Sequence, residues 1–178
     1  NARISIERFA DLQVSTMQAM NDETLGYGTR RLPVGCWSMM CHAVIGCETL
    51  GKALGRYCRF YQLFEMGVHP VLEDDGELAR IFLLAQDDSG ASKPYLHELL
   101  LFNTHRFASW LVQEHLPVQS VQFESAPLAP DQDYRHMFLG NPIIFEQARS
   151  QLVLSRSVLD KRIAQNETSL RHFLRHPA

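Results

Sequence analysis

The sequence predicts a single α+β domain, with an antiparallel or mixed sheet of about five to six strands covered by helices. Helical segments and short apolar strand segments follow one another irregularly along the 178 residues, which is typical of this class. The chain is 46% hydrophobic, enough for a substantial core and too apolar for a disordered chain. One segment, about 94–115, is apolar on several sides and predicts a long buried helix.

The N-terminal third is organised around residues 36–64. Residues 5–20 carry apolar side chains at helical spacing and predict a first helix. Residues 36–45 are almost free of charge and end at Gly46, so we predict a strand buried on both faces. Thr49 can then cap a helix whose apolar positions follow the i, i+3, i+4, i+7 pattern. The interpretation is a central strand leading into a helix.

A β-hairpin is predicted next. Residues 65–73 suit an edge strand, because Pro70 has no N–H to donate to a neighbouring strand. Asp-Asp-Gly at 74–76 is a turn signal, since glycine tolerates the positive φ that the turn requires. Residues 77–86 form the returning strand, and residues 87–93 form a polar loop.

The long helix begins at Pro94, and proline suits the first position of a helix. Pro117 follows its end. The remaining segments are expected as a short strand, a short helix, two strands and a largely helical tail, at 118–124, 131–139, 143–145, 151–154 and 155–178.

Composition excludes several classes of protein. The formal charge is -3 and no block of five like charges occurs, so binding of nucleic acid through a basic face is not indicated. No apolar run reaches the ~18 residues of a membrane span. Without a secretion signal, the four cysteines are expected as reduced thiols in a cytoplasmic protein. The first residue, Asn1, is not methionine, so we expect a fragment or a processed chain.

The sequence offers no motif for catalysis or metal binding. The cysteines are separated by four, five and ten residues, and these spacings match no compact zinc pattern. Cys41 and His42 would point to opposite faces of a strand. His97-Glu98 lacks a second histidine at metalloprotease spacing, where Leu101 stands. Phosphate-loop, Gly-x-Ser-x-Gly and paired-carboxylate signatures are absent. We therefore expect neither an enzyme nor a metal or cofactor.

Two patches of sequence carry a family resemblance. Gly35 and the run after it lead to Thr-Leu-Gly-Lys-Ala-Leu at 49–54 and to Arg-Tyr-Cys-Arg-Phe at 56–60. Tyr-Arg-His-Met-Phe-Leu-Gly-Asn-Pro-Ile-Ile-Phe stands at 134–145, with one residue more before its glycine than the family pattern. With Gln-Leu-Val-Leu at 151–154, these patches resemble the N-terminal effector-binding (arabinose-binding-like) domain of AraC-type transcriptional regulators.

The resemblance implies a bacterial regulatory domain at 1–165, followed at 166–178 by the start of a helical linker. The linker would lead to a C-terminal DNA-binding domain with two helix-turn-helix motifs, which this chain does not contain. A small metabolite would bind between helices and sheet and change the conformation or dimerisation of the attached domain. We expect the following side chains to line the pocket: Trp37, Met39, Cys41, His42, Cys47, Tyr61, Phe64, His69, Phe82 and His105.

Two alternatives remain open. A domain of this kind can be a dimerisation or interaction module without a ligand, which the apolar residues on more than one face of the 94–115 helix would explain. The cysteines, at 36, 41, 47 and 58, could instead make it a thiol-based sensor or enzyme. The alternative to a pocket is that the predicted pocket residues form a packed core with hydrogen-bonded histidines. Aromatic and cysteine side chains are usually buried for packing alone. A ligand pocket would have similar walls with a few polar groups among them.

Overall fold

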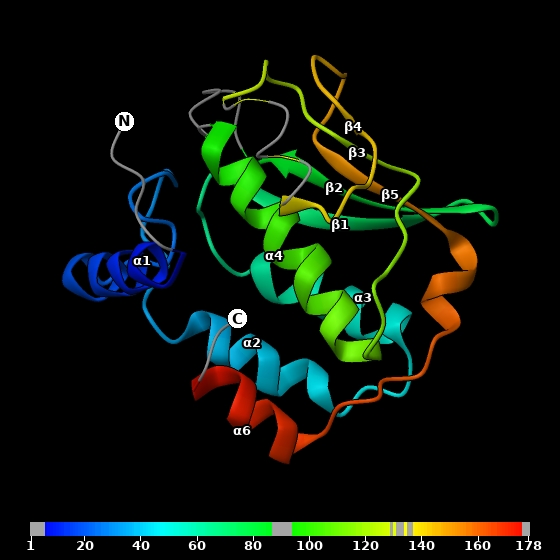
Figure 1. Cartoon of the computed structure of the whole chain (residues 1–178), viewed down its shortest axis with the longest axis horizontal. Helices are drawn as coiled ribbons and strands as arrows, with labels where there is room; N and C mark the ends of the chain where they lie inside the picture. Colours follow the sequence, from blue (N-terminus) through cyan, green and yellow to red (C-terminus); the bar gives the residue numbers. More distant parts are fainter. Residues whose placement is uncertain (1–5, 87–93, 129, 131–133, 135–136, 176–178) are drawn as a thin grey trace.

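A computed structural model of the chain describes residues 6–86, 94–128, 130, 134 and 137–175 (Figure 1). Within these residues the fold is α+β, as predicted, with five α-helices, one 3-10 helix and a five-stranded mixed sheet. The elements, in chain order, are α1 (Ile6–Met20), α2 (Cys36–Ile45), α3 (Leu50–Tyr61), β1 (Val68–Asp74), β2 (Leu78–Ala85), α4 (Pro94–Val112), β3 (Ser120–Gln122), β4 (Ile143–Ile144), β5 (Gln151–Ser155), η1 (Arg156–Asp160) and α6 (Glu167–Arg175).

The sheet has the strand order β1-β2-β5-β3-β4. Neighbouring strands run antiparallel, except for β3 and β4, which are parallel. The predicted hairpin is confirmed: Gly76 has φ +94° in the turn, and Asp75 accepts a hydrogen bond from the Leu78 N–H at 2.7 Å. Pro70 lies on an edge strand, where its missing N–H costs no pairing.

Helices cover one face of the sheet. Ala79, Ile81 and Leu83 alternate along β2 as fully buried side chains, while Phe82 and Leu84 project to the other face and stay partly or largely exposed. α3 packs on β1 and α4 packs on β5, and α4 crosses in front of the strands in Figure 1. The core therefore lies between these two helices and the inner face of the sheet.

The predicted central strand is wrong, because residues 36–45 form helix α2. Its buried residues are Met40, Cys41, Val44 and Ile45, which is the i, i+1, i+4, i+5 spacing of one helix face. A short apolar run cannot be assigned to helix or strand by periodicity alone. Strand geometry therefore does not separate Cys41 from His42. On the helix they are consecutive, with Cys41 buried and His42 exposed.

Two acidic residues ahead of α2 stabilise its start. The Glu23 carboxylate accepts the N–H groups of Gly35 and Trp37, both at 2.8 Å, and so satisfies amides that the first helical turn leaves free. Asp22 is 2% exposed and accepts N–H groups from the same loop, including that of Leu32 at 3.0 Å. The α1–α2 connection is thus ordered by two carboxylates outside the helix.

The predicted helix after Thr49 is confirmed as α3, with the Thr49 hydroxyl accepting the Lys52 N–H at 3.4 Å. The tail is helical only in part. η1 and α6 are separated by residues 161–166, which are not helical and include a β-bridge between Thr49 and Arg162. The polar loop predicted at 87–93 lies outside the described residues, as does much of the helix predicted at 131–139.

Helix α6 returns to pack against α2 (Figure 1). Its Leu170 is fully buried, and Phe173 stacks on Trp110 of α4 with 4.4 Å between ring centroids. His42 near the end of α2 lies 3.2 Å from the Glu167 carboxylate in the first turn of α6. The C-terminal helix is therefore fixed to both α2 and α4.

Candidate functional site

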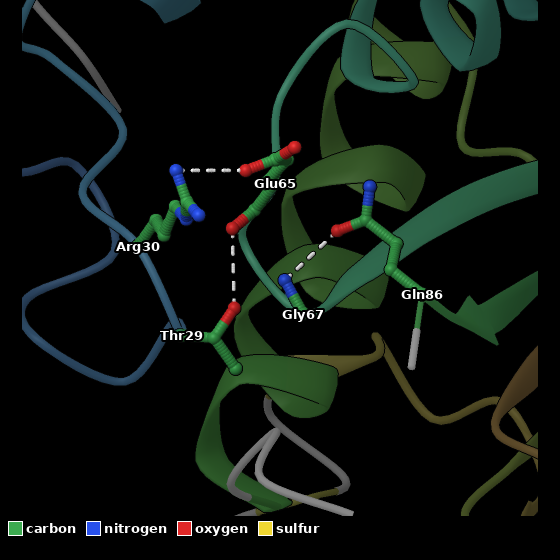
Figure 2. A pocket seen from close by; sticks show the side chains of 5 residues that line it. All are labelled: Thr29, Arg30, Glu65, Gly67 and Gln86. Atoms are coloured by element: carbon green, nitrogen blue, oxygen red, sulfur yellow. Dashed lines mark hydrogen bonds and ion pairs between the residues drawn. The ribbon is translucent and has the colours of Figure 1, made fainter. Parts of the chain in front are cut away.

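A polar cavity of about 280 Å³ lies where the α1–α2 connection meets the start of β1 and the end of β2 (Figure 2). The Arg30 guanidinium pairs with the Glu65 carboxylate at 2.9 Å, and the Thr29 hydroxyl donates to the Glu65 carbonyl at 3.1 Å. The Gly67 N–H donates to the Gln86 side-chain oxygen at 2.8 Å. Its polar groups thus already pair with one another, as expected of a seam between segments.

This seam requires glycine at position 67. Gly67 has φ +92°, and a Cβ there would lie 2.7 Å from the Thr29 side chain. We expect Gly67→Ala to lower the free energy of unfolding by about 1–3 kcal/mol, through backbone strain and the steric clash. Gly76→Ala is the matched control, because Gly76 has φ +94° and no atom within 4 Å of its added Cβ. Urea unfolding should show a larger loss for Gly67→Ala; equal losses would mean that the Thr29 contact contributes nothing.

A second cavity, of about 170 Å³, lies between the first turn of α4 and the inner face of the β1–β2 hairpin. Strand pairing brings its apolar wall together, because Val68 is opposite Ala85, and Leu83 is opposite Pro70 on the same face. The polar side of the cavity comes from His97 on α4 and from residues after β3. The residues lining it are Val68, Leu83, Ala85, Pro94, His97, Glu124 and Ser125. We call it the α4–hairpin cavity.

His97 is the buried polar group of this cavity, with 9% of its surface exposed. Its Nδ1 lies 2.9 Å from the hydroxyl of the buried Ser150, and that hydroxyl accepts the Glu124 N–H at 3.2 Å. Burial lowers the pKa of His97, against a smaller opposing effect of the Glu124 charge. The ring is therefore neutral at neutral pH and is held in place from behind by Ser150.

A second polar contact holds the segment after β3 against α4. The buried Glu98 carboxylate accepts the Tyr134 hydroxyl at 2.5 Å, and that hydroxyl accepts the Leu128 N–H at 2.7 Å. Tyr134 also packs on Phe123, which is fully buried at the end of β3. The contact positions the segment that contributes Glu124 and Ser125 to the α4–hairpin cavity.

Substitutions at Glu98 should separate its charge from its hydrogen bond. Burial raises its pKa above the ordinary 4.5, partly opposed by the Tyr134 hydrogen bond. For a carboxyl group with a raised pKa, the contribution to stability is complete below the unfolded pKa and is lost as pH rises through the folded value. We expect Glu98→Gln to remove this loss, and Glu98→Leu to cost about 1–3 kcal/mol by removing the buried hydrogen bond between Tyr134 and Glu98. Chemical unfolding between pH 4 and 8 tests both; a Glu98→Leu protein as stable as Glu98→Gln would contradict the role of the hydrogen bond.

None of the ten side chains predicted from the sequence lines either of these two cavities in the described part of the chain. They lie in four places. Trp37, Met39, Cys41 and His42 are on α2 with Cys47 after it, Tyr61 and Phe64 are at the end of α3, His69 and Phe82 are on β1 and β2, and His105 is on α4. His69 and Phe82 lie on the outer face of the sheet, as do the residues paired with them on the neighbouring strand, Leu84 and Val71.

Several of these residues have specific neighbours in the protein. His105 is 1% exposed and donates from Nε2 to the Leu116 carbonyl at 2.8 Å, and burial lowers its pKa. The Arg149 guanidinium lies 4.2 Å from the centre of the Phe82 ring. Met39 is 64% exposed on α2. These surroundings resemble a packed core and surface more than a shared pocket.

The cysteines are free thiols, three of them buried. Burial raises the pKa of Cys36 and Cys41, and raises that of Cys58 to about 12, which disfavours the reactive thiolate. We expect a thiol reagent at neutral pH to label the partly exposed Cys36 slowly and the three buried cysteines only after unfolding. Rapid labelling of Cys41 or Cys58 in the native protein would restore the thiol-sensor alternative.

The residues of the α4–hairpin cavity have no local sequence signal. In the sequence, His97 belongs only to an incomplete metalloprotease motif. Glu124 and Ser125 lie at the end of a short predicted strand and belong to no motif. Within the described residues, no group of three or more His, Cys, Asp or Glu side chains is placed to hold a metal ion. In that same part of the chain, no helix combines the length and the apolar character needed to cross a bilayer.

Known proteins resemble this chain over most of its length. Residues 1–163 match the family of the arabinose-binding domain of AraC transcription regulators, N-terminal. The ornithine utilization regulator of Pseudomonas aeruginosa is 26% identical over 165 residues, covering 92% of this chain and 48% of the regulator. The crystal structure of the transcriptional regulator CdpR from Pseudomonas aeruginosa has the same fold, with TM-score 0.50 and 17% identity, over 96% of this chain and 61% of CdpR. The chain thus spans about half the length of the curated regulator it matches. On the match over residues 1–163, the chain belongs to the family of N-terminal arabinose-binding domains of AraC-type transcription regulators.

Proposed function

We propose that this domain binds a small metabolite in the α4–hairpin cavity and thereby controls an attached DNA-binding domain. The observation that supports the proposal is the composition of the cavity: Val68, Leu83 and Ala85 form an apolar wall opposite the buried His97. Ligand sites typically combine such walls with a few fixed polar groups. The polar cavity at Thr29 is larger, but its groups are already paired, so a ligand there would have to break existing contacts.

The family supports a regulatory role, and the relatives are transcriptional regulators. The name of the ornithine utilization regulator suggests that this chain also responds to a small metabolite. We propose residues 1–165 as the sensing domain and residues 166–178 as the start of a linker, in a cytoplasmic protein without catalytic activity. Binding to DNA would require a domain beyond this chain.

Helix α4 offers a route from the cavity to the C-terminal helix. Its first turn lines the cavity through Pro94 and His97. Near its other end, Trp110 stacks on Phe173 of α6, and the Trp110 carbonyl accepts the Gln165 side-chain N–H at 2.9 Å. A ligand that binds better to one position of α4 would shift the population of α6 positions. We propose this shift as the output signal.

A thermal-shift screen of small metabolites tests the sensing role. A ligand at 100 times its Kd stabilises the folded state by about 2.7 kcal/mol, which raises the Tm of a domain of this size by about 5–10 °C. Ala85→Leu, which narrows the cavity, should abolish the shift, while Thr29→Val in the polar cavity should keep it. If no class of metabolite raises the Tm, the sensing role is contradicted.

A second candidate function, a dimerisation or interaction module, is favoured by helix α1. None of its described side chains is buried, and Leu12, Val14 and Met20 are 56%, 42% and 38% exposed. α1 lies at the side of the domain in Figure 1, and Gln13 reaches the Tyr95 hydroxyl at 3.1 Å. Light scattering over a concentration series, with Leu12→Lys as the variant, tests it. A wild-type dimer that dissociates in the variant would support the module, and a monomer at all concentrations would exclude dimerisation.

A further inference from the structure

We propose that the ligand of the α4–hairpin cavity is a small organic amine, an ammonium group on a short apolar chain. This inference rests on the proposed function, since it assigns a chemical class to the ligand of the same cavity. The charge and the apolar surface of the residues that line the cavity support it.

The described residues that line the cavity carry a net negative charge. Among the described lining residues, only Glu124 carries a charge at neutral pH. His97 is neutral because burial lowers its pKa, and the other lining residues are Ser125 and apolar side chains. Within the described part of the chain, no Lys or Arg nitrogen lies within 4 Å of the Glu124 carboxylate. Among the described residues, the Glu124 carboxylate therefore has no Lys or Arg partner, which leaves it to the cation of a ligand.

The backbone of Glu124 is held by a hydrogen bond, while its side chain is exposed. Its N–H donates to the Ser150 hydroxyl, which also contacts His97 at 2.9 Å, so both residues are held on the same anchor. Carboxylate–ammonium hydrogen bonds are stronger than neutral ones. Ser125 lines the same cavity, and a serine hydroxyl can accept a further hydrogen bond.

The opposite wall favours an apolar body. Val68, Leu83 and Ala85 present methyl groups from the inner face of the hairpin, and burying methylene groups against them adds affinity. A carboxylate ligand would meet Glu124 without a lining Lys or Arg among the described residues to compensate. An alcohol of equal length would bury the same chain but lack the charge-assisted contact.

Isothermal titration calorimetry of the 178-residue chain with butylamine, butyrate and 1-butanol separates the effect of the ligand's charge from that of its apolar chain. The three ligands share a four-carbon chain and differ in the polar group. We expect butylamine to bind best. Glu124→Gln keeps the size of the side chain and should weaken amine binding about tenfold, the loss of one charge-assisted hydrogen bond. Glu65→Gln, in the polar cavity, should leave the Kd unchanged.

The possible outcomes are distinct. Preferred binding of butyrate or butanol, or an unchanged Kd in Glu124→Gln, would overturn the amine assignment and leave the sensing role intact. Loss of amine binding in Glu65→Gln instead would place the amine at the other cavity and overturn it as well. Failure of the three probes together with the whole metabolite panel would contradict the sensing role itself. Circular dichroism of both variants confirms that they are folded.

Discussion

Asp22→Ala is expected to lower the free energy of unfolding by about 2–5 kcal/mol, because several buried donors would lose their common acceptor. The Asp22 carboxylate accepts the Thr24 N–H at 2.9 Å, the Thr24 hydroxyl at 2.8 Å, the Gly26 N–H at 2.9 Å and the Leu32 N–H at 3.0 Å. With Glu23, it orders the loop that starts α2. We therefore expect the variant to lose order in this loop as well as stability.

The pH dependence gives a second signature of Asp22. Burial raises its pKa, but the hydrogen bonds from Leu32, Thr24 and Gly26 together outweigh burial, so the net pKa lies below the ordinary 3.8. For a carboxyl group with a lowered pKa, the stability contribution is present above the unfolded pKa and is lost as pH falls through the folded value. The difference between wild type and Asp22→Asn should therefore shrink in acid.

Urea unfolding at pH 7 and pH 3 measures both effects. Asp11→Ala is the control, because Asp11 is exposed on α1. A loss below about 0.5 kcal/mol for Asp22→Ala, within the range of ordinary surface substitutions, would contradict the role of this carboxylate.

Phe107→Ala is expected to have an effect of similar or larger size, about 3–5 kcal/mol, as for other buried aromatic residues. Phe107 is 2% exposed, and its ring lies 5.2 Å from Trp37, 5.8 Å from Trp110 and 6.1 Å from Phe173, measured between centroids. These three rings belong to α2, α4 and α6. Removing Phe107 therefore opens a cavity at the point where the three helices meet.

Hydrogen exchange distinguishes this local role from general destabilisation. In Phe107→Ala, amides of α6 should exchange faster by a larger factor than amides of β2, because α6 loses part of its contact with α4. Phe107→Leu, which keeps most of the buried volume, should show a smaller effect at both places. Equal acceleration in α6 and β2 would mean that the aromatic contacts do not hold α6 specifically.

The elements with local signals were predictable from the sequence. Thr49 marks the start of α3, Asp-Asp-Gly marks the hairpin turn at 74–76, and Pro94 marks the start of α4. Helix α2 was not predictable in this way. Its apolar run fits a buried strand as well as a buried helix, and the carboxylate that satisfies its first amides belongs to Glu23, far back in the sequence.

The candidate site was less accessible to sequence reasoning than the fold. The α4–hairpin cavity joins four separate segments, and only the pairing of Val68 with Ala85 and the packing of α4 bring them together. Aromatic and cysteine residues in the 36–64 stretch suggested a pocket because ligand sites are lined by such side chains. In the described part of the chain they line neither of the two cavities, and Trp37 packs against Phe107.

NMR spectroscopy of the methyl groups of Val68, Leu83 and Ala85 tests the central claim most directly, because these groups form the apolar wall of the α4–hairpin cavity. Titration with small metabolites, amines included, should shift these methyl signals saturably, while those of Val158 and Leu159 in η1 should stay in place. If every metabolite leaves the three wall signals unchanged, or shifts only signals elsewhere, the α4–hairpin cavity is not the sensor site.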